Sequence, residues 1–181
     1  DIPVSDIQSG LYHAKVPGRM EIYTSNDKKI TAIVDYAHNQ LSFQKLFESV
    51  RNEYPGYRVM IIFGCPGKKA QDRRHDLGEI AGKNADYIYL TEEDAGEEDP
   101  LVIAQEIARA VEKEKAPYEM IIDREQAIAR AVEDAANAQG NTVILITGKG
   151  AVTRQKRGTE YIPVMSDVEC VHLELKKYNE K

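Results

Sequence analysis

The sequence contains little that would suit a secreted, membrane-spanning or nucleic-acid-binding protein. Its two cysteines, Cys65 and Cys170, are too few for a disulfide framework and lack the spacing of a metal site. No apolar run approaches the roughly 20 residues that a membrane-spanning helix needs, and no basic-then-apolar signal peptide opens the chain. A net charge of −6 argues against a nucleic-acid surface, which needs clustered positive charge. We therefore expect a cytoplasmic protein with no metal site of its own and no membrane or nucleic-acid partner.

The chain also lacks an initiator methionine, since it begins Asp1-Ile2-Pro3. A cut inside a longer protein or proteolytic processing would both produce such a beginning. Val16-Pro17-Gly18 then interrupts a helical pattern rather than continuing it. We expect residues 1–18 to be a linker from an upstream domain that this sequence does not contain. Residues 19–181 are enough for one domain with a substantial core and too few for two.

What is present is a regular alternation of strand and helix patterns. Short apolar runs, typical of strands buried on both faces of a parallel sheet, lie at residues 30–34, 58–63, 87–91, 119–122 and 142–147. Helical spacing lies between them, as in Phe43, Leu46, Phe47 and Val50, and a further helix is expected from Pro100 to about Lys113. This order predicts right-handed βαβ crossovers. Residues 20–24 add an antiparallel strand through a Ser25-Asn26-Asp27 turn. The predicted fold class is a doubly wound, Rossmann-like α/β domain whose sheet is mostly parallel.

Polar and glycine-rich segments follow these predicted strands. In open α/β sheets, ligands bind beyond the carboxyl ends of the strands. The segments in question are Asp35-Tyr36-Ala37-His38-Asn39, Gly64-Cys65-Pro66-Gly67-Lys68-Lys69, the acidic stretch 92–99 and Gly148-Lys149-Gly150. We expect a binding site where they meet.

The segment 35–39 places a carboxylate, a phenol, an imidazole and an amide at one strand end. A helix cap by Asn39 would explain part of it, but Asp, Tyr and His together exceed what a cap needs. With the upstream Pro17-Gly18-Arg19, this segment resembles the Mur ligases, which form peptide bonds at the expense of ATP, and especially the muramyl-tripeptide synthetases among them. The resemblance implies that ATP is contacted across a domain cleft by Arg19, Asp35, Tyr36, His38 and Asn39. Gln40 stands where the family usually has proline.

The second motif is Gly64-Cys65-Pro66-Gly67 with Arg73-Arg74 downstream. Alone it indicates a tight turn with solvated arginines, and it is not a P-loop, because GxxxxGK[ST] occurs nowhere in the chain. In register with the family, Arg74 falls on the arginine that binds the carboxylate of the incoming amino acid, a task that suits a planar guanidinium. Lys68-Lys69-Ala70 replaces the Asp-Arg-Asp of many relatives.

The third and fourth motifs concern the amino-acid substrate. Residues 92–99 would ordinarily be a solvated acidic loop before a helix. In the family branch that adds meso-diaminopimelate, an Asp-Asn-Pro-Arg motif binds the far carboxylate of that substrate, whereas Glu93-Asp94-Ala95-Gly96 here contains no arginine. Gly148-Lys149-Gly150, which by itself indicates a glycine turn, matches the last family motif, with Gln155 downstream. Ala151 and Val152 replace the His and Glu of that branch. Both departures favour L-lysine, bound through Arg74, Glu93, Asp94 and Gly148.

The resemblance implies part of an enzyme that adds a third amino acid to UDP-MurNAc-L-Ala-D-Glu through an acyl phosphate. ATP and Mg²⁺ would be bound mainly by an upstream central ATPase domain, beside a UDP-sugar-binding domain of the same chain. The fragment would be monomeric and inactive alone, and no residue is assigned a certain catalytic role. The alternatives are a meso-diaminopimelate-adding homologue, a domain of a folylpolyglutamate or cyanophycin synthetase, and a non-catalytic nucleotide- or anion-binding module.

Overall fold

The computed structural model describes residues 2–13 and 16–181, except for the side chains of residues 11 and 13. Residues 1, 14 and 15, which belong to the expected linker, lie outside the described residues. The elements are α1 (Val4–His13), β1 (Glu21–Thr24), β2 (Ile30–Asp35), α2 (Gln40–Glu53), β3 (Arg58–Phe63), α3 (Asp72–Asn84), β4 (Tyr87–Leu90), α4 (Pro100–Lys113), β5 (Tyr118–Met120), α5 (Arg124–Asn137), β6 (Thr142–Thr147), β7 (Arg154–Arg157), β8 (Glu160–Pro163) and α6 (Asp167–Asn179).

Six strands form one sheet in the order β1-β2-β6-β3-β4-β5. Strand β1 pairs with β2 in antiparallel fashion, and the other neighbours are parallel. The prediction of a mostly parallel sheet with one antiparallel strand is therefore confirmed. The bounds of β3, β6 and α4 agree with the sequence, whereas β5 begins one residue earlier than expected and ends two residues earlier.

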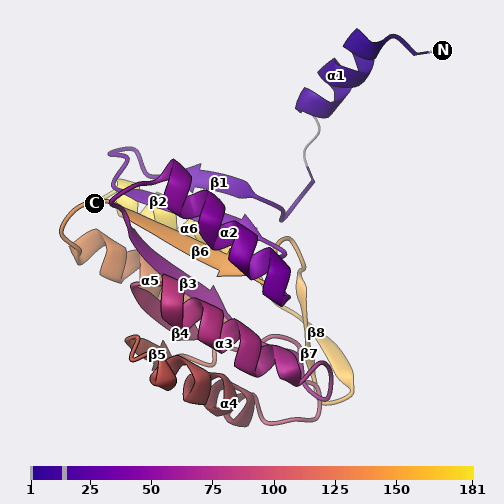
Figure 1. Ribbon diagram of the computed structural model, residues 1–181, viewed down its shortest axis with the longest axis vertical. Coiled ribbons are helices and arrows are strands. Elements are labelled where there is room, and N and C mark those ends of the chain that lie inside the picture. The colour runs from indigo at the N-terminus through magenta and orange to yellow at the C-terminus, as the bar shows by residue number, and fades with distance from the viewer. Residues whose placement is uncertain (1, 14–15) are drawn as a thin grey trace.

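Helices cover both faces of this sheet (Figure 1). One hydrophobic cluster joins α2, α3 and α4 to the sheet, and a second joins α5 and α6 to its other face. In β6, Leu145 belongs to the first cluster and Ile144 to the second, because successive side chains of a strand point to opposite faces. Because both faces of β6 are buried, its sequence is a continuous apolar run and does not alternate with polar residues.

Capped helices begin at the carboxyl edge of the sheet. Asn39 caps α2, Asp99 caps α4 and Asp123 caps α5, each by accepting a backbone N–H of the first turn. These caps satisfy donors that a helix leaves unpaired at its start. The loops that follow β2, β4 and β5 are thereby fixed where a ligand would bind.

One helix and one hairpin were not predicted. Helix α1 lies within the expected linker, stands apart from the sheet in Figure 1 and exposes Val4 and Ile7. Strands β7 and β8 form an antiparallel hairpin beside the carboxyl edge. None of the helices in the described part of the chain is both long and apolar enough to cross a membrane.

We expect Leu145→Ala to lower the free energy of unfolding by about 2–5 kcal/mol, because it leaves a cavity at a fully buried position of the central strand. Urea denaturation followed by circular dichroism measures the change. Leu41→Ala is the matched control, since Leu41 is 65% exposed on α2 and its loss should cost less than about 0.5 kcal/mol. Equal costs for the two variants would contradict this account of the core.

Candidate functional site

A cleft of about 400 Å³ opens at the carboxyl edge of the sheet. Its walls come from the loops after β2, β3, β4 and β6 and from the hairpin β7–β8. The lining residues used below are Tyr36, His38, Lys68, Lys69, Arg73, Glu93, Asp94, Gly96, Glu97, Gly148, Lys156 and Tyr161. The four polar segments found in the sequence therefore meet in one place.

Glycines allow these loops to approach each other closely. Gly148 has φ +103°, and a methyl group built on it would overlap the Glu93 carboxylate. A methyl group on Gly67 would overlap the Ala95 carbonyl. Gly18 and Gly150, both at positive φ, are in mutual contact, so that a side chain on either would collide with the backbone of the other. Glycine is needed at all four positions for its small size, and at Gly18, Gly148 and Gly150 also for its backbone freedom.

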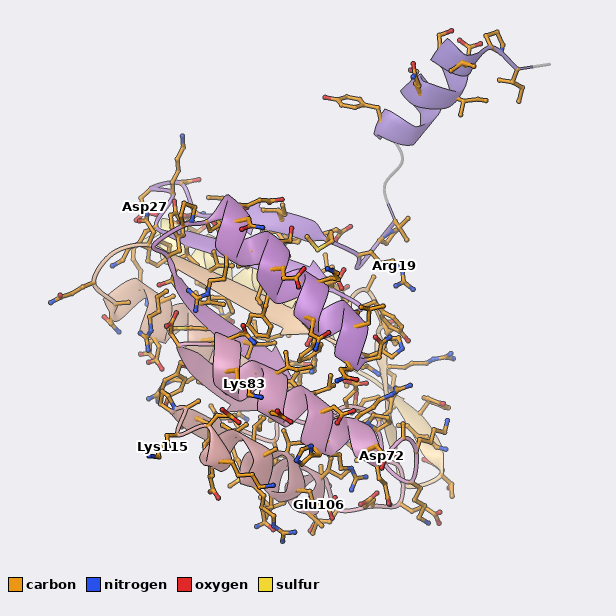
Figure 2. All side chains as sticks on the ribbon, viewed as in Figure 1. Arg19, Asp27, Asp72, Lys83, Glu106 and Lys115 are labelled. Carbon is orange, nitrogen blue, oxygen red and sulfur yellow. The ribbon has the colours of Figure 1, made fainter. Side chains whose placement is uncertain are left out.

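Arg19, Tyr36 and His38, three of the residues predicted to contact a nucleotide, form one group. The Arg19 guanidinium lies over the Tyr36 ring, with its central carbon 4.7 Å from the ring centroid, which is a favourable cation–π distance. The His38 ring meets the Tyr36 ring edge-on, and His38 Nδ1 donates to the Tyr36 carbonyl at 2.7 Å. A carbonyl only accepts, so Nδ1 carries the proton and Nε2 is left for other contacts. In Figure 2, Arg19 lies on the same side of the domain as Asp72, the first residue of α3, and Lys115 lies on the opposite side.

Asp35 and Asn39, the other two nucleotide candidates, are engaged within the protein. Asp35 accepts hydrogen bonds from the backbone N–H groups of Met20 at 2.9 Å and Ala37 at 2.7 Å. Asn39 and Ser42 form a reciprocal capping box at the start of α2. The helix-cap interpretation of Asn39 thus describes its contacts, and any contact of either residue with a nucleotide stays a prediction.

The acidic loop is largely neutralised by its own neighbours. Arg157 pairs with Glu92, Lys149 with Asp94 at 2.8 Å, Lys68 with Glu97 at 2.8 Å, and Arg74 with Glu98 at 2.7 Å. Within the described part of the chain, Glu93 has neither an ion pair nor a hydrogen bond to its carboxylate. Of the two acidic residues predicted to bind the substrate, Asp94 is therefore already paired, and Glu93 is the one left without a cationic partner among the described residues.

Burial raises the pKa of Glu93 to about 7, although the charges of Arg124 and Lys149 act in the opposite direction. Asp94 and Asp167 add a further, smaller upward push. A ligand ammonium beside Glu93 would favour its ionised form, because an opposite charge lowers the pKa of a carboxyl group. Without a cationic ligand, the ionised form of Glu93 is therefore disfavoured by burial.

Arg74, the predicted partner of the substrate carboxylate, makes its contacts within the protein, and its role toward a ligand stays a prediction. Its side chain is 3% exposed, makes a bidentate ion pair with Glu98 (2.7 and 2.8 Å) and donates to Glu106 at 2.6 Å. It is not among the residues that line the cleft, and it lowers the pKa of Glu98 to about 2. Glu98 also accepts the Lys68 backbone N–H at 2.9 Å. Arg74 therefore holds two loops together, and its guanidinium is occupied by protein carboxylates.

Other cations line the cleft itself: Lys69, Arg73 and Lys156. None has an ion pair within the described residues. The helical spacing indicates that Arg74, and not Arg73, lies on the buried face of α3. Leu77, Gly78 and Ala81 lie three, four and seven residues after Arg74, and all three are buried. Lys156 gave no such signal, since its hairpin was not predicted.

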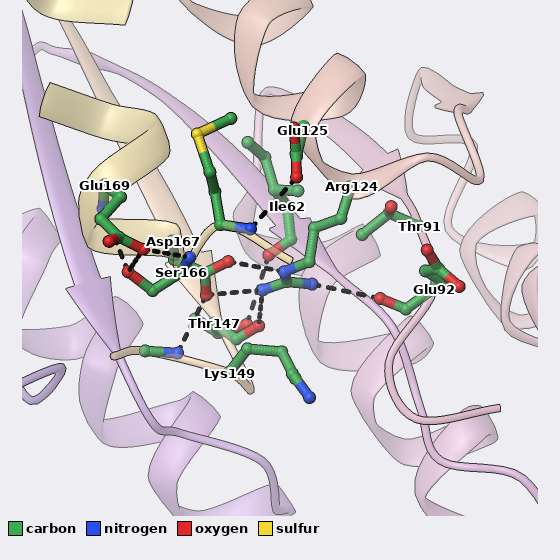
Figure 3. Close-up of polar contacts among 12 residues, drawn as sticks. Ile62, Thr91, Glu92, Arg124, Glu125, Thr147, Lys149, Ser166, Asp167 and Glu169 are labelled. Carbon is green, nitrogen blue, oxygen red and sulfur yellow. Dashed lines mark hydrogen bonds and ion pairs between the residues drawn. The ribbon is translucent and has the colours of Figure 1, made fainter. Parts of the chain in front are cut away.

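A buried ion pair supports the floor of the site (Figure 3). Arg124, at the start of α5, donates to both carboxylate oxygens of Asp167 at 2.7 and 2.9 Å and to the Thr147 carbonyl at 2.7 Å. Asp167 also accepts the Gly150 N–H at 2.9 Å. Arg124 and Asp167 also border a small cavity of about 30 Å³, which Gln155 lines as well; the side-chain nitrogen of Gln155 is buried and has no hydrogen-bond partner among the described residues. This volume suits one or two water molecules.

Comparison with known proteins places these motifs in a family. A family model described as "Mur ligase, glutamate ligase domain" matches residues 18–150. The chain is 41% identical to a UDP-N-acetylmuramoyl-L-alanyl-D-glutamate–L-lysine ligase of Streptococcus agalactiae over 83% of its length, and this covers 30% of that enzyme. It is 35% identical to a 2,6-diaminopimelate ligase of Caldanaerobacter subterraneus, over 90% of this chain and 33% of that one. The chain thus spans about a third of the curated relatives it matches.

Among solved structures, the fold is similar to that of a UDP-N-acetylmuramoyl-L-alanyl-D-glutamate–2,6-diaminopimelate ligase. The TM-score is 0.79 at 21% identity, and the match covers 98% of this chain and 37% of that one. At this identity the likeness concerns the fold alone.

The raised pKa of Glu93 predicts a pH-dependent stability difference. The folded state keeps the Glu93 proton up to about pH 7, whereas the unfolded state loses it near its model value of 4.5. Glu93 therefore lowers the stability of the wild type progressively as the pH rises from about 4.5 to 7. We expect Glu93→Gln to gain stability relative to wild type over this range, and the difference to level off above it. Chemical denaturation at pH 5, 6, 7 and 8 measures the difference, and a constant value would contradict the prediction.

Arg74 and Arg73 form a matched pair for testing a structural role. Arg74→Met leaves Glu98 and Glu106 without their cation and should cost about 2–3 kcal/mol, below the ~3–5 kcal/mol of a fully buried pair because both glutamates are partly exposed. Arg73→Met removes no ion pair and should cost less than about 0.5 kcal/mol. Thermal and urea unfolding of both variants checks the ranking, and similar costs would show that the Arg74 ion pairs stabilise little.

Proposed function

The chain belongs to the Mur ligase family, and on that premise we propose that it is the amino-acid-accepting C-terminal domain of a cytoplasmic ATP-dependent ligase of peptidoglycan synthesis. The complete enzyme would add a third amino acid to UDP-MurNAc-L-Ala-D-Glu. One observation carries the proposal beyond the family. Among the residues that the structure describes, the cleft contains one carboxylate without an ion pair, Glu93, together with cations that have none either. This charge pattern suits an amino acid, which brings an ammonium and a carboxylate in one small molecule.

In the proposed reaction, ATP phosphorylates the peptide carboxylate, and the neutral amine of the amino acid then attacks the acyl phosphate. The C–N bond forms as the C–O bond to phosphate breaks, and the amine loses a proton. This domain would contribute positioning, since holding the amine in place removes orientational freedom before the attack. ATP, Mg²⁺ and the UDP-sugar would be held mainly by upstream domains.

On the nucleotide side, we propose that Arg19, Tyr36 and His38 face ATP across the domain boundary. The Tyr36 ring holds the Arg19 guanidinium in place by a cation–π contact. His38 Nε2 remains available for a hydrogen bond with the nucleotide, because Nδ1 is bonded to the Tyr36 carbonyl. Asp35 and Asn39 would act through the backbone, by holding the Met20 turn and the start of α2. The proposal therefore gives the nucleotide contacts to Arg19, Tyr36 and His38, because the side chains of Asp35 and Asn39 already accept hydrogen bonds from the backbone.

We further propose L-lysine as the amino acid. Its far end carries only an ammonium, which Glu93 is suited to receive, whereas diaminopimelate adds a second carboxylate there. Gly96 provides no cation for it. Two basic residues nearby are already occupied: Lys149 by Asp94 and the Arg154 carbonyl, and Arg154 by the Tyr161 ring, 4.9 Å from its guanidinium carbon. The family contains ligases named for each of the two amino acids, and the sequence identity is 41% to the L-lysine ligase and 35% to the 2,6-diaminopimelate ligase compared above.

Steady-state kinetics of the complete ligase with each amino acid tests this proposal. We expect kcat/KM for L-lysine to exceed that for meso-diaminopimelate by about a hundredfold, because the second carboxylate would lie beside the Glu93 carboxylate, and a contact between like charges costs several kcal/mol. Glu93→Gln should raise KM for L-lysine and leave KM for ATP within about twofold. Glu97→Gln is the matched control, since Lys68 already neutralises Glu97. Equal kcat/KM values, or a preference for diaminopimelate, would overturn the choice of L-lysine.

A further inference from the structure

Arg74 is a buried cation that two carboxylates hold, one from a loop and one from a helix. We propose that Glu98, the loop carboxylate, occupies the place on Arg74 that the α-carboxylate of the incoming amino acid takes, so that the substrate displaces it on binding. Glu106, the helix carboxylate, keeps the guanidinium oriented in both states. The inference rests on the proposed function and specifies how that site exchanges one carboxylate for another.

The guanidinium of Arg74 lies directly behind the wall of the cleft. Its Nη2 donates to the carbonyl of Pro66 at 3.3 Å, and Pro66 lines the cleft. The stem of Glu98 packs against the same wall, since a methyl group built on Gly67, another lining residue, would lie 3.2 Å from Glu98 Cβ. Glu98 thus contacts both the cleft wall and the guanidinium, and its departure would leave room for a carboxylate that comes from the cleft.

The hydrogen bonding of Arg74 is crowded at one nitrogen and incomplete at another. Nη1 donates to Glu98 Oε1 at 2.7 Å and to Glu106 Oε2 at 2.6 Å, so two negative charges share one donor group. Nε is buried and has no hydrogen-bond partner among the described residues, and a buried donor without a partner costs free energy. A ligand carboxylate that accepted from Nη2 and Nε would satisfy this donor and leave Nη1 to Glu106.

The two glutamates differ in how firmly the fold holds them. Glu106 belongs to α4, which packs so closely on α3 that a methyl group built on Gly78 would overlap the Ile107 carbonyl. Its ion pair therefore joins two helices that are already in contact. Glu98 lies in the loop before α4, and apart from its own ion pair its carboxylate accepts only the Lys68 N–H among the described residues, at 2.9 Å. Glu98 is therefore the partner that a ligand displaces more readily.

Exchange of one carboxylate for another leaves the charge around Arg74 unchanged. The substrate carboxylate replaces the charge of Glu98, and the released Glu98 regains water, since its side chain is already 20% exposed. The hydrogen bonds from Arg74 lower the pKa of Glu98 to about 2, so Glu98 competes as an anion throughout the neutral pH range. Removing its charge should strengthen substrate binding, because the substrate then has no internal competitor to displace.

The test compares L-lysine with L-lysinamide as substrates of the complete ligase. Lysinamide keeps both amines and lacks only the α-carboxylate, so it cannot take the place of Glu98. In Glu98→Gln we expect kcat/KM for L-lysine to rise about 3- to 10-fold, the effect of a binding-competent state populated at about 10–30% in the wild type, and kcat/KM for lysinamide to stay within about twofold. In Glu106→Gln the preference for L-lysine over lysinamide should fall about tenfold, because the guanidinium loses the partner that orients it.

Glu97→Gln is the matched control, because it removes the same charge from a neighbouring glutamate that Lys68 neutralises, and it should change neither value. A Glu98→Gln enzyme whose kcat/KM for L-lysine falls, or rises equally for both substrates, would overturn the proposal. If Glu98→Gln does not fold, Glu98→Asp decides, since its shorter side chain should weaken the competition and give a smaller rise for L-lysine alone. A wild-type enzyme that forms no product from L-lysine or diaminopimelate would instead refute the proposed function.

Discussion

The site depends on the buried ion pair between Arg124 and Asp167. It joins the start of α5 to the start of α6, and through the Thr147 carbonyl and the Gly150 N–H it also fixes the loop after β6. Breaking a buried pair leaves an uncompensated charge, so neither residue is replaceable alone. Lys149 extends from this fixed loop to Asp94, and Asp94 in turn holds the hairpin through the Lys156 N–H. The geometry of the cleft is thus transmitted from the core to the hairpin through a continuous series of charged contacts.

Neutralisation within the protein lowers the negative charge that so acidic a loop presents to the cleft. Four of its five glutamates and aspartates between residues 92 and 98 have a cationic partner. The charges that remain are Glu93 on one side and a few basic groups on the other. A count of acidic residues in the sequence therefore overstates the negative charge that a ligand meets.

Most of the fold was predictable because strands buried on both faces leave uninterrupted apolar runs, as β3 and β6 do. The hairpin β7–β8 was not, because Arg154-Gln155-Lys156-Arg157 has no apolar alternation and is held by contacts with residues some 60 positions away. The location of the site followed from the strand ends. The helical spacing also indicates which of the two neighbouring arginines is buried, Arg74, and which faces the cleft, Arg73, but the motif alone does not distinguish them. Which acidic residues are already paired depends on tertiary contacts, which no local pattern records.

The contact between Gly18 and Gly150 has a consequence for how such a chain can evolve. Each position lacks space for a side chain because the backbone of the other fills it, and both have a positive φ. A substitution at one position is not relieved by any substitution at the other, since neither has a side chain left to shorten. Substitution of either glycine is therefore disfavoured, whichever of the two changes first. Lineages that alter it must first change the course of the backbone, by insertion or deletion in one of the two loops.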